Sequence, residues 1–273
     1  MTAGQRARRV VASRVATARA RLRAERSLAG WDRAQRIALP SLDPGRVPVV
    51  FCTWRRLGRL GRTLDQLSAQ DLPVQALIWN NSGEREPVDI AAATARIPVF
   101  TYHSPRNIGG FGRFYLAREL AAAGHRSVVL IDDDQDFGPS AVSDLASMHR
   151  PGSLSGWWAF RFRGSGYGDR ARVAAGEPAS YVGTGGMIAD TSVFLDGVLF
   201  DCPRRFWFVD DLWLCYVARQ LCGYELFGSA ALFECGEDEH ALYRTLGRTK
   251  WQFLRYLIRQ GWDPAPGSAV TPG

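Results

Sequence analysis

The sequence has few cysteines and no long apolar run. Its five cysteines are odd in number and include no Cys-x-x-Cys pair; they are Cys52, Cys202, Cys215, Cys222 and Cys235. This usage favours reduced, mostly buried thiols in a cytosolic protein and argues against a zinc site. No apolar run approaches the roughly 18 residues that a membrane span needs. Arginines interrupt the N-terminus, where a secretory signal would need an apolar core.

The positive charge is confined to one end of the chain. Of the net +7, residues 1–46 carry +8, with eleven arginines and three acidic residues, so the rest of the chain is near neutral. A near-neutral body argues against a basic groove for nucleic acid. We expect residues 5–39 to meet an anionic partner such as a lipid surface, as peripheral contact at the inner face of the cell membrane. Packing of this arm on the body or on a second subunit is the alternative.

What is present is the composition of an ordinary globular protein, 46% hydrophobic and 22% charged. A chain of 273 residues suits one large α/β domain with a short extension. We predict a basic helical arm and linker over residues 1–46, a catalytic domain over 47–263 and a flexible tail over 264–273. The arm follows from apolar residues at helical spacing, namely Val11, Val15, Ala18 and Leu22.

From Val47 onward, short apolar runs alternate with amphipathic segments. Strands are predicted at 47–53, 74–79, 98–103 and 127–131, and helices at 57–69, 112–123, 210–221 and 242–258. The alternation predicts βαβ units, and therefore a mostly parallel sheet with flanking helices. Such sheets bind ligands beyond the carboxyl ends of their strands. The polar clusters that follow the strands are therefore the candidate site.

Three aspartates, Asp132, Asp133 and Asp134, directly follow the apolar strand at 127–131. Like charges this close raise one another's pKa, and a divalent cation relieves the repulsion. Carboxylate oxygens suit Mg²⁺ or Mn²⁺, which would bridge to a diphosphate. A solvated acidic turn, or a helix N-terminus before Pro139, is the alternative.

Two further segments are candidates for nucleotide contact. The glycines between Arg106 and Gly112 precede a helix and let backbone N–H groups approach a phosphate. Arg106 and Asn107 can hydrogen-bond a diphosphate or ribose, although a plain turn explains the glycine spacing about as well. Asn80 and Asn81 end the second strand, where they either contact a base and ribose or form a simple turn.

An acidic pair, Asp210 and Asp211, lies in the apolar stretch 206–214, where two acids are costly unless used or paired. The start of a helix, where negative charge is favoured, is the alternative. In the functional interpretation Asp211 is the general base for an acceptor hydroxyl, and Asp210 orients the acceptor or a neighbouring side chain. Trp157 and Trp158 are a candidate sugar platform, with core packing as the alternative.

In their order along the chain these motifs resemble those of the GT-A glycosyltransferases, especially the inverting family 2 type that includes galactofuranosyl and rhamnosyl transferases. The resemblance spans about Val47 to His240. The matching segments are Thr53–Arg56, Trp79–Gly83, Arg106–Gly112, Asp132–Asp134, Gly183–Gly186, Val209–Asp211 and His240. Asn80-Asn81 departs from the family, whose members usually carry Asp-Asn or Asp-Asp there, and this makes the nucleotide base less predictable.

The resemblance implies a GT-A fold and an inverting, metal-dependent transfer in cell-envelope or other glycoconjugate synthesis. The donor would be a UDP-, dTDP- or GDP-linked sugar, and the acceptor a glycan, a lipid-linked group or a small molecule. The implied site comprises catalytic Asp211 and Asp210; donor-binding Thr53, Arg56, Asn80, Asn81, Arg106, Asn107, Gly109, Gly110, Asp132 and Asp133; acceptor-binding Trp157, Trp158, Gly185 and Gly186; and Asp132, Asp134 and His240 as ligands of Mn²⁺ or Mg²⁺. Glu237 and Asp238 are alternative ligands, and Arg56 would equally pair with a surface acid.

Two other classes of function remain open on the sequence alone. A nucleotidyltransferase acting on sugar phosphates also uses an acidic cluster and Mg²⁺. It would lack the usual lysine-bearing glycine loop here, because Lys250 is the only lysine and lies late in the chain. A non-catalytic module that binds sugars or a lipid surface is the other.

Overall fold

The structure is a computed structural model that describes residues 37–54, 56–82, 96–105, 107–236 and 246–264. Four predictions fall outside these described residues. They concern most of the basic arm, Arg106, His240 with its acidic neighbours, and nearly all of the C-terminal tail. The domain boundaries at both ends of the catalytic domain therefore remain predictions.

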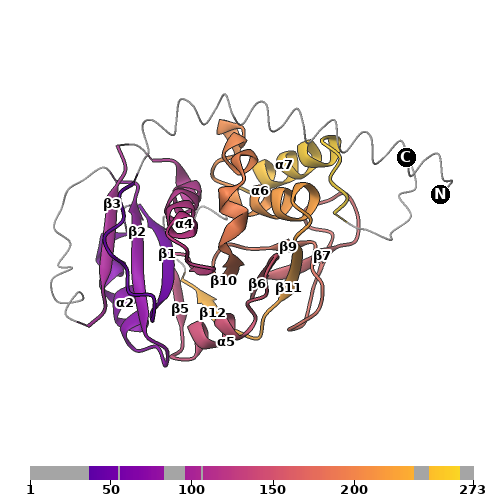
Figure 1. Cartoon of the computed structure of the whole chain (residues 1–273). Helices are drawn as coiled ribbons and strands as arrows, with labels where there is room; N and C mark the ends of the chain where they lie inside the picture. The colour runs from indigo at the N-terminus through magenta and orange to yellow at the C-terminus, as the bar shows by residue number, and fades with distance from the viewer. Residues whose placement is uncertain (1–36, 55, 83–95, 106, 237–245, 265–273) are drawn as a thin grey trace.

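A seven-stranded sheet forms the centre of the molecule (Figure 1). Its strands are β1 (Val47–Thr53), β2 (Val74–Asn80), β3 (Val99–His103), β4 (Ser127–Leu130), β6 (Ser153–Gly156), β10 (Met187–Asp190) and β11 (Glu225–Gly228). They lie in the order β11-β6-β10-β4-β1-β2-β3. β10 runs antiparallel to β4 and β6, and every other neighbouring pair is parallel. The predicted mostly parallel sheet is confirmed, and the carboxyl ends of β1, β2 and β4 meet at one edge.

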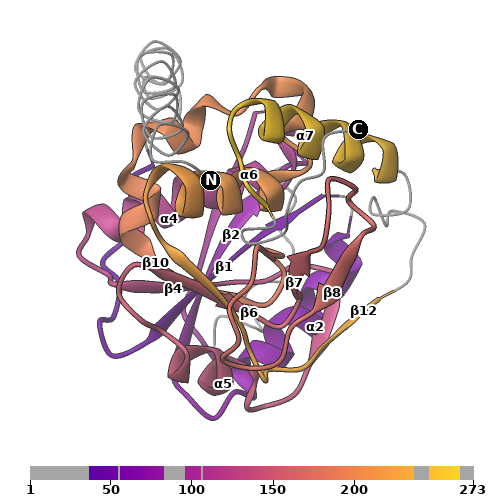
Figure 2. The same ribbon diagram turned by 90° about the vertical axis from the view of Figure 1, so that its right-hand side faces the viewer.

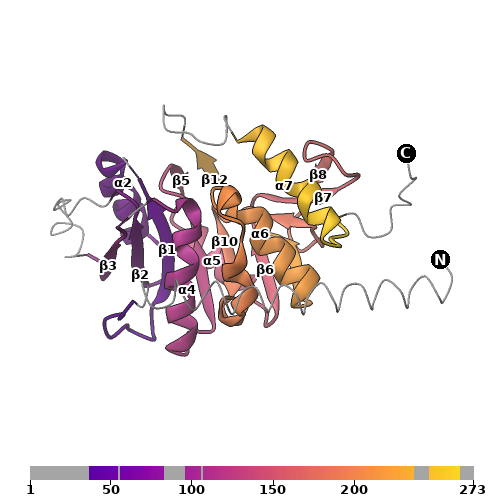
Figure 3. The ribbon, with the colours of Figure 1, turned by 90° about the horizontal axis from the view of Figure 1, so that it is seen from above.

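Helices cover both faces of this sheet, as Figures 1 and 3 show. One face carries α2 (Leu57–Ser68) and α5 (Ala141–Ser147). The other carries α4 (Gly112–Ala122), α6 (Asp210–Tyr216) and α7 (Gly247–Arg259). α4 lies across β1, β2 and β4, while α7 packs on α6. This is the layered α/β arrangement that the alternating pattern predicts.

Alternate residues of the central strands supply two separate cores. In β1, Val50 and Cys52 join the core beneath α4 and α6, whereas Val49 and Phe51 join the core beneath α2 and α5. The side chains of Val49, Val50 and Phe51 are fully buried. A strand covered on both faces reads as a continuous apolar run, which is why β1 is recognisable in the sequence. Burying each such side chain contributes about 1.5–3 kcal/mol.

Two smaller sheets lie beyond the carboxyl edge of the central sheet. β5 (Gln135–Phe137) pairs antiparallel with β12 (Phe233–Cys235). A three-stranded antiparallel sheet has the order β8-β7-β9, with β7 at Ala159–Phe162, β8 at Arg170–Arg172 and β9 at Tyr181–Val182. Figure 2 shows β7 and β8 below α7. These short strands bring residues from late in the chain to the edge where β1 and β4 end.

The later helices differ from their predicted limits. α6 ends as an α-helix at Tyr216 and continues as a π-helical turn over Val217–Leu221. α7 begins at Gly247, and residues 242–245 of the predicted helix lie outside the described residues. Among the described helices, none is long and apolar enough to cross a bilayer. All five cysteines are free, as predicted, and three of them, Cys52, Cys202 and Cys215, are buried.

Candidate functional site

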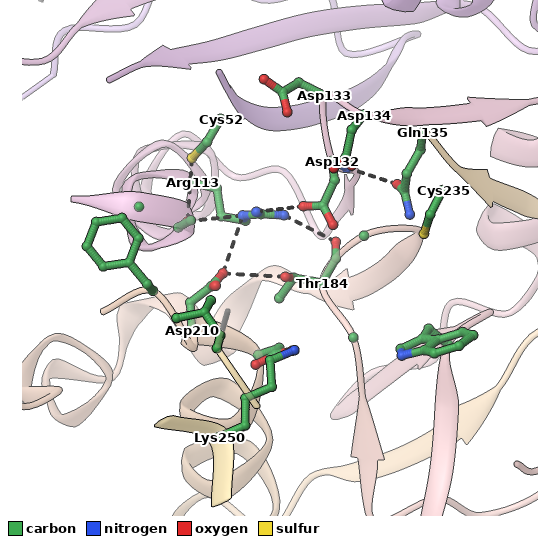
Figure 4. A pocket seen from close by; sticks show the side chains of 18 of the residues that line it. Cys52, Arg113, Asp132, Asp133, Asp134, Gln135, Thr184, Asp210, Cys235 and Lys250 are labelled. Atoms are coloured by element: carbon green, nitrogen blue, oxygen red, sulfur yellow. Dashed lines mark hydrogen bonds and ion pairs between the residues drawn. The ribbon is translucent and has the colours of Figure 1, made fainter. Parts of the chain in front are cut away.

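A cavity of about 600 Å³ lies beyond the carboxyl ends of β1 and β4, where α/β sheets bind their ligands. Its walls come from the loops after these strands, from the two small sheets and from the first turns of α6 and α7 (Figure 4). The predicted site residues in its wall are Thr53, Arg56, Asn81, Asn107, Gly109, Gly110, Asp132, Asp133, Asp134, Trp157, Trp158, Gly185, Asp210 and Asp211. Asn80 and Gly186 are not part of that wall.

The carboxylates of the acidic motif, Asp132–Asp134, are each paired with an arginine. The Arg56 guanidinium lies 2.9 Å from a carboxylate oxygen of Asp133 and 3.3 Å from one of Asp134. Asp132 pairs instead with Arg113, at 2.8 Å. Burial raises the pKa of Asp133, and the charge of Arg56 acts in the opposite direction. Arg56 thus pairs with acids, as the alternative interpretation expected, but these acids belong to the cavity itself.

Arg113 occupies the middle of the cavity, between Asp132 and Asp210 (Figure 4). Its side chain is only 6% exposed. It donates hydrogen bonds to the carbonyl oxygens of Gly110 at 3.0 Å and Ile131 at 3.1 Å. Burial alone would lower the pKa of Arg113, but the two carboxylates more than offset this, so the pKa is raised. One buried cation therefore links the glycine loop, the end of β4 and the acidic pair.

The two asparagines after β2 have different surroundings. Asn81 is buried; its carbonyl oxygen accepts from the Trp79 indole at 3.1 Å and the Ile108 backbone at 3.0 Å, and its amide donates to the Gly109 carbonyl at 3.0 Å. Asn80 hydrogen-bonds the His103 ring at 3.1 Å and lies outside the cavity wall. Asn81 thus holds the glycine loop against β2. Asn80 also accepts a hydrogen bond from the Ser82 backbone N–H at 2.8 Å, as in a turn, and its contact with the donor stays a prediction.

The glycine loop approaches the acidic pair without room for side chains. The Asn107 carboxamide accepts a hydrogen bond from the Gly109 backbone at 2.8 Å, and Gly109 has a φ of 66°, which favours glycine. A Cβ added to Gly110 would lie 2.6 Å from a carboxylate oxygen of Asp210. The loop backbone therefore lies directly against the acidic pair.

Replacing Gly110 by alanine is expected to displace Asp210, because a methyl group cannot share the space of its carboxylate. Overpacking of this kind costs about 1–3 kcal/mol. We expect a lower melting temperature and weaker nucleotide binding in Gly110→Ala, measured by thermal unfolding and titration calorimetry. Gly58→Ala is the matched control, because a Cβ at Gly58 meets nothing within 4 Å. Equal behaviour of the two variants would contradict the close approach of loop and acid.

Asp210, at the start of α6, is buried beneath the cavity. Its carboxylate lies 3.4 Å from the Arg113 guanidinium and accepts a hydrogen bond from the Thr184 hydroxyl at 3.4 Å. Burial raises the pKa of Asp210 to about 6; Arg113 opposes this rise, and Asp211 adds to it. The contact with Arg113 is compatible with the predicted role of orienting a neighbouring side chain.

Asp211 has a separate set of partners. The Tyr181 hydroxyl donates a hydrogen bond to one carboxylate oxygen, and the ammonium of Lys250 lies 3.7 Å from the same oxygen. The other oxygen accepts from the Leu212 backbone N–H at 2.8 Å. Both carboxylate oxygens of Asp211 therefore have hydrogen-bond partners, and the side chain also lines the cavity.

The tryptophan pair borders the cavity on another side. Trp157 donates a hydrogen bond from its indole to the Gly185 carbonyl at 2.5 Å and also packs against the core beneath α2 and α5. Trp158 is 36% exposed. The Arg172 guanidinium lies over both rings, 5.0 and 4.9 Å from their centroids. Core packing thus accounts for much of Trp157, whereas Trp158 presents the more accessible face.

No protein-family model matches the sequence, and no curated protein sequence matches it. Solved structures match its fold at low identity. The mannosyltransferase PcManGT from Pyrobaculum calidifontis, in complex with GDP-Man and Mn²⁺, matches with a TM-score of 0.57 and 14% identity, over 95% of this chain and 76% of that chain. TarS 1-349 from S. aureus, in complex with UDP-GlcNAc, matches with a TM-score of 0.53 and 13% identity, over 78% of this chain and 66% of that chain.

The chain has the GT-A fold. The fold class predicted from the sequence is confirmed. Within this GT-A fold, the acidic motif leaves β4 at the sheet edge, and the acidic pair begins α6 on the far side of the same cavity. The likeness is one of fold, and the chemistry of the site has to be argued from its own residues.

The sequence patterns assigned no role to several charged or polar residues of this cavity, among them Arg113, Arg170, Tyr181 and Lys250. Arg113 appeared only as part of the predicted helix 112–123. Its position one helical turn after the glycine loop is the signal that points it back toward that loop. Lys250 stood out as the only lysine, but nothing in its local sequence indicates that α7 brings it to Asp211.

The acidic motif offers the oxygen donors that Mn²⁺ or Mg²⁺ prefers. The side chain of Asp132 is 39% exposed and that of Asp134 is 16% exposed, and both line the cavity. Within the described residues, no group of three or more His, Cys, Asp and Glu side chains is arranged to hold a metal. The predicted third ligand, His240, lies outside them. The donor chemistry of Asp132 and Asp134 therefore fits such an ion, with both carboxylates also paired to arginines.

Proposed function

We propose that this protein is a glycosyltransferase that moves a sugar from a nucleotide-diphosphate donor to an acceptor hydroxyl with inversion, in cell-envelope or other glycoconjugate synthesis. One observation carries the proposal. The acidic motif, the glycine loop and the acidic pair, which lie far apart in the sequence, line a single cavity of about 600 Å³. The GT-A fold and its likeness to proteins solved with GDP-Man and UDP-GlcNAc support the same class of donor.

The donor end of the cavity is the end with the acidic motif. Arg56 and Arg113 bring two guanidinium groups to it, and guanidinium groups bind phosphate oxygens in a bidentate way. The N–H groups of Ile108 and Gly109 already donate to the side chains of Asn81 and Asn107, so the two guanidinium groups are the proposed hydrogen-bond donors to the diphosphate. These two arginines would bind and orient the diphosphate. Asn81 acts by fixing the loop.

A divalent cation would be held by Asp132 and Asp134, together with His240. When bound, such an ion would supply positive charge that offsets the negative charge of the diphosphate leaving group. The chain itself places Arg56 beside Asp134 and Arg113 beside Asp132. Mn²⁺ is the cation in the complex of the Pyrobaculum calidifontis mannosyltransferase, and for this chain Mn²⁺ or Mg²⁺ remains a proposal.

At the other end, Asp211 would act as the general base. Its carboxylate takes the proton of the acceptor hydroxyl while the hydroxyl oxygen forms a bond to the anomeric carbon. The bond from that carbon to the diphosphate oxygen breaks, and its electron pair leaves with the diphosphate. Attack from the face opposite the leaving group inverts the configuration. Tyr181 and the Leu212 N–H orient the carboxylate for this step.

A donor screen tests the proposal. The protein is screened with UDP-, dTDP- and GDP-linked sugars. We expect one of these nucleotide classes to raise the melting temperature, and to raise it more with Mn²⁺ than with EDTA. Ligand at 100 times its Kd adds about 2.7 kcal/mol, which corresponds to a rise of roughly 5–10 °C in a domain of this size. Turnover should release nucleoside diphosphate, whereas a nucleotidyltransferase would release pyrophosphate.

Arg56→Met should weaken the stabilisation, because the guanidinium beside Asp133 and Asp134 is lost. Arg62→Met is the matched control, since Arg62 lies on α2, the helix that begins directly after Arg56, is 62% exposed and pairs with Asp136. If no nucleotide sugar stabilises the wild-type protein with either cation, the proposed function is wrong. An unchanged shift and full turnover in EDTA would contradict only the role of the metal.

A further inference from the structure

Two cations line the cavity near the acidic pair and have no part in the proposed donor site. Arg170 comes from β8 and Lys250 from α7. Burial lowers the pKa of Lys250 and the charge of Asp211 raises it, with a net rise, while Arg170 acts to lower it. The two positive charges therefore lie close enough to repel each other. Asp211 is the acid that pairs with Lys250.

The Arg170 guanidinium is held by aromatic rings rather than by an acid. It lies 4.1 Å from the ring centroid of Tyr167, 4.3 Å from that of Phe160 and 5.6 Å from that of Tyr181. Its Nη1 atom is buried and has no hydrogen-bond partner among the described residues. Over that same part of the chain, no carboxylate forms an ion pair with Arg170. A buried donor without a partner is costly, so such a group is expected where a ligand supplies the acceptor.

The ammonium group of Lys250 also has a hydrogen-bond donor available for a ligand. Its nearest acid, Asp211, is 3.7 Å away, and its ammonium lies 5.5 Å from the ring centroid of Tyr167. An ammonium group has three donors, and Asp211 and the Tyr167 hydroxyl account for two of them. Among the described residues, Asp211 is the carboxylate that pairs with Lys250 and none pairs with Arg170, so this corner of the cavity has an excess of positive charge in aromatic surroundings. A carboxylate or a phosphate would gain more from that excess than a neutral sugar would.

We propose that Arg170 and Lys250 form a subsite for an anionic group, a carboxylate or a phosphate, carried by the acceptor. This rests on the proposed function, because the acceptor hydroxyl must reach Asp211 while its anionic group reaches the cations. The position favours the acceptor over the donor diphosphate. Lys250 and the acidic motif lie at opposite ends of the cavity in Figure 4, with Arg113 and Thr184 between them.

The test compares sugars that differ in charge, with the donor site filled by the nucleoside diphosphate that the donor screen selects. The probes are methyl glucuronide for a carboxylate, glucose 6-phosphate for a phosphate, and methyl glucoside as the neutral reference. At least one anionic sugar is expected to bind ten-fold or more tightly than the neutral one. Arg170→Gln and Lys250→Gln should each reduce this preference roughly ten-fold, as loss of a charged hydrogen bond does.

Matched controls lie on β7, the strand paired with β8, and on α7 itself. Arg161→Gln on β7 and Arg255→Gln on α7 remove exposed arginines outside the cavity wall and should leave the preference unchanged. Lys250→Arg should retain it. Circular dichroism and thermal unfolding confirm that each variant is folded.

Equal or undetectable binding of all three sugars to the wild-type protein overturns the subsite. So does a loss of nucleoside diphosphate affinity in Arg170→Gln, or a changed preference between UDP-glucuronate and UDP-glucose, because either result assigns the cations to the donor. Failure of the proposed function has a different signature. In that case no nucleoside diphosphate binds in the first place.

Discussion

Asp211→Asn is expected to reduce the rate of sugar transfer by roughly 10²–10⁴-fold, the usual effect of losing a general base. Asparagine keeps the size of the side chain and can still accept a hydrogen bond from Tyr181, but it cannot take a proton. Donor binding should change little, because the proposed diphosphate contacts lie with Arg56 and Arg113. The measurement is the kcat for nucleoside diphosphate release with donor and acceptor present, alongside donor Kd and melting temperature.

Asp144→Asn is the control, since Asp144 lies in the first turn of α5, outside the cavity wall, where it accepts a hydrogen bond from the Ser140 hydroxyl at 3.0 Å. If Asp211→Asn transfers sugar at nearly the wild-type rate with its fold intact, the base assignment is wrong. Asp210 is then the next candidate, because burial raises its pKa to about 6 and a base works best with a pKa near the working pH. A non-catalytic binding module would bind its ligand but release no nucleoside diphosphate, in the wild-type protein as in both variants.

The fold was accessible from the sequence because the central strands are buried on both faces. β1 and β2 read as apolar runs with helical segments between them, and that alternation defines which edge of the sheet carries the loops. The placement of the acidic motif at that edge follows from its position directly after β4. Both predictions use only the pattern of residues that are neighbours in the sequence, together with the general rule that parallel sheets bind ligands at their carboxyl edge.

The partners within the cavity were not accessible in the same way. Asn80 and Asn81 are neighbours in the chain, yet one hydrogen-bonds His103 of β3 and the other holds the glycine loop. The residue at which β2 ends determines which asparagine side chain lies beside β3 and which lies beside the glycine loop. Lys250 reaches Asp211 only because α7 packs on α6. Contacts of this kind are set by tertiary packing, and the local sequence does not record them.

Arg113→Met is expected to destabilise the protein by about 3–5 kcal/mol, as removal of one partner from a buried ion pair does. Methionine fills much of the same volume, but Asp132 and Asp210 lose the cation that both approach. The hydrogen bonds to the carbonyls of Gly110 and Ile131 are lost as well. For a domain of this size the melting temperature should fall on the order of 10 °C, and nucleotide affinity should fall with it.

The pH dependence of this variant identifies the cause of the loss. Burial raises the pKa of Asp210 to about 6 in the presence of Arg113, which acts to lower it, so the pKa rises further when Arg113 is removed. The folded variant then holds that proton more tightly than the unfolded chain, whose aspartates titrate near about 3.9. Stability is therefore recovered as the pH falls through the raised pKa toward that value and is lost as the pH rises.

A double-mutant comparison separates charge from packing. Adding Asp210→Asn to Arg113→Met removes one unpaired carboxylate and should restore on the order of 1 kcal/mol, since the two sites share a contact. Arg96→Met is the matched control; its pair with Asp65 is 65% and 64% exposed, and exposed pairs contribute about 1 kcal/mol or less. If Arg113→Met costs no more than Arg96→Met, or loses stability as the pH falls from 7 to 5, then Arg113 does not hold the acidic motif and the acidic pair together. The cavity would then keep its shape through backbone packing alone, and the proposed diphosphate site would depend on Arg56.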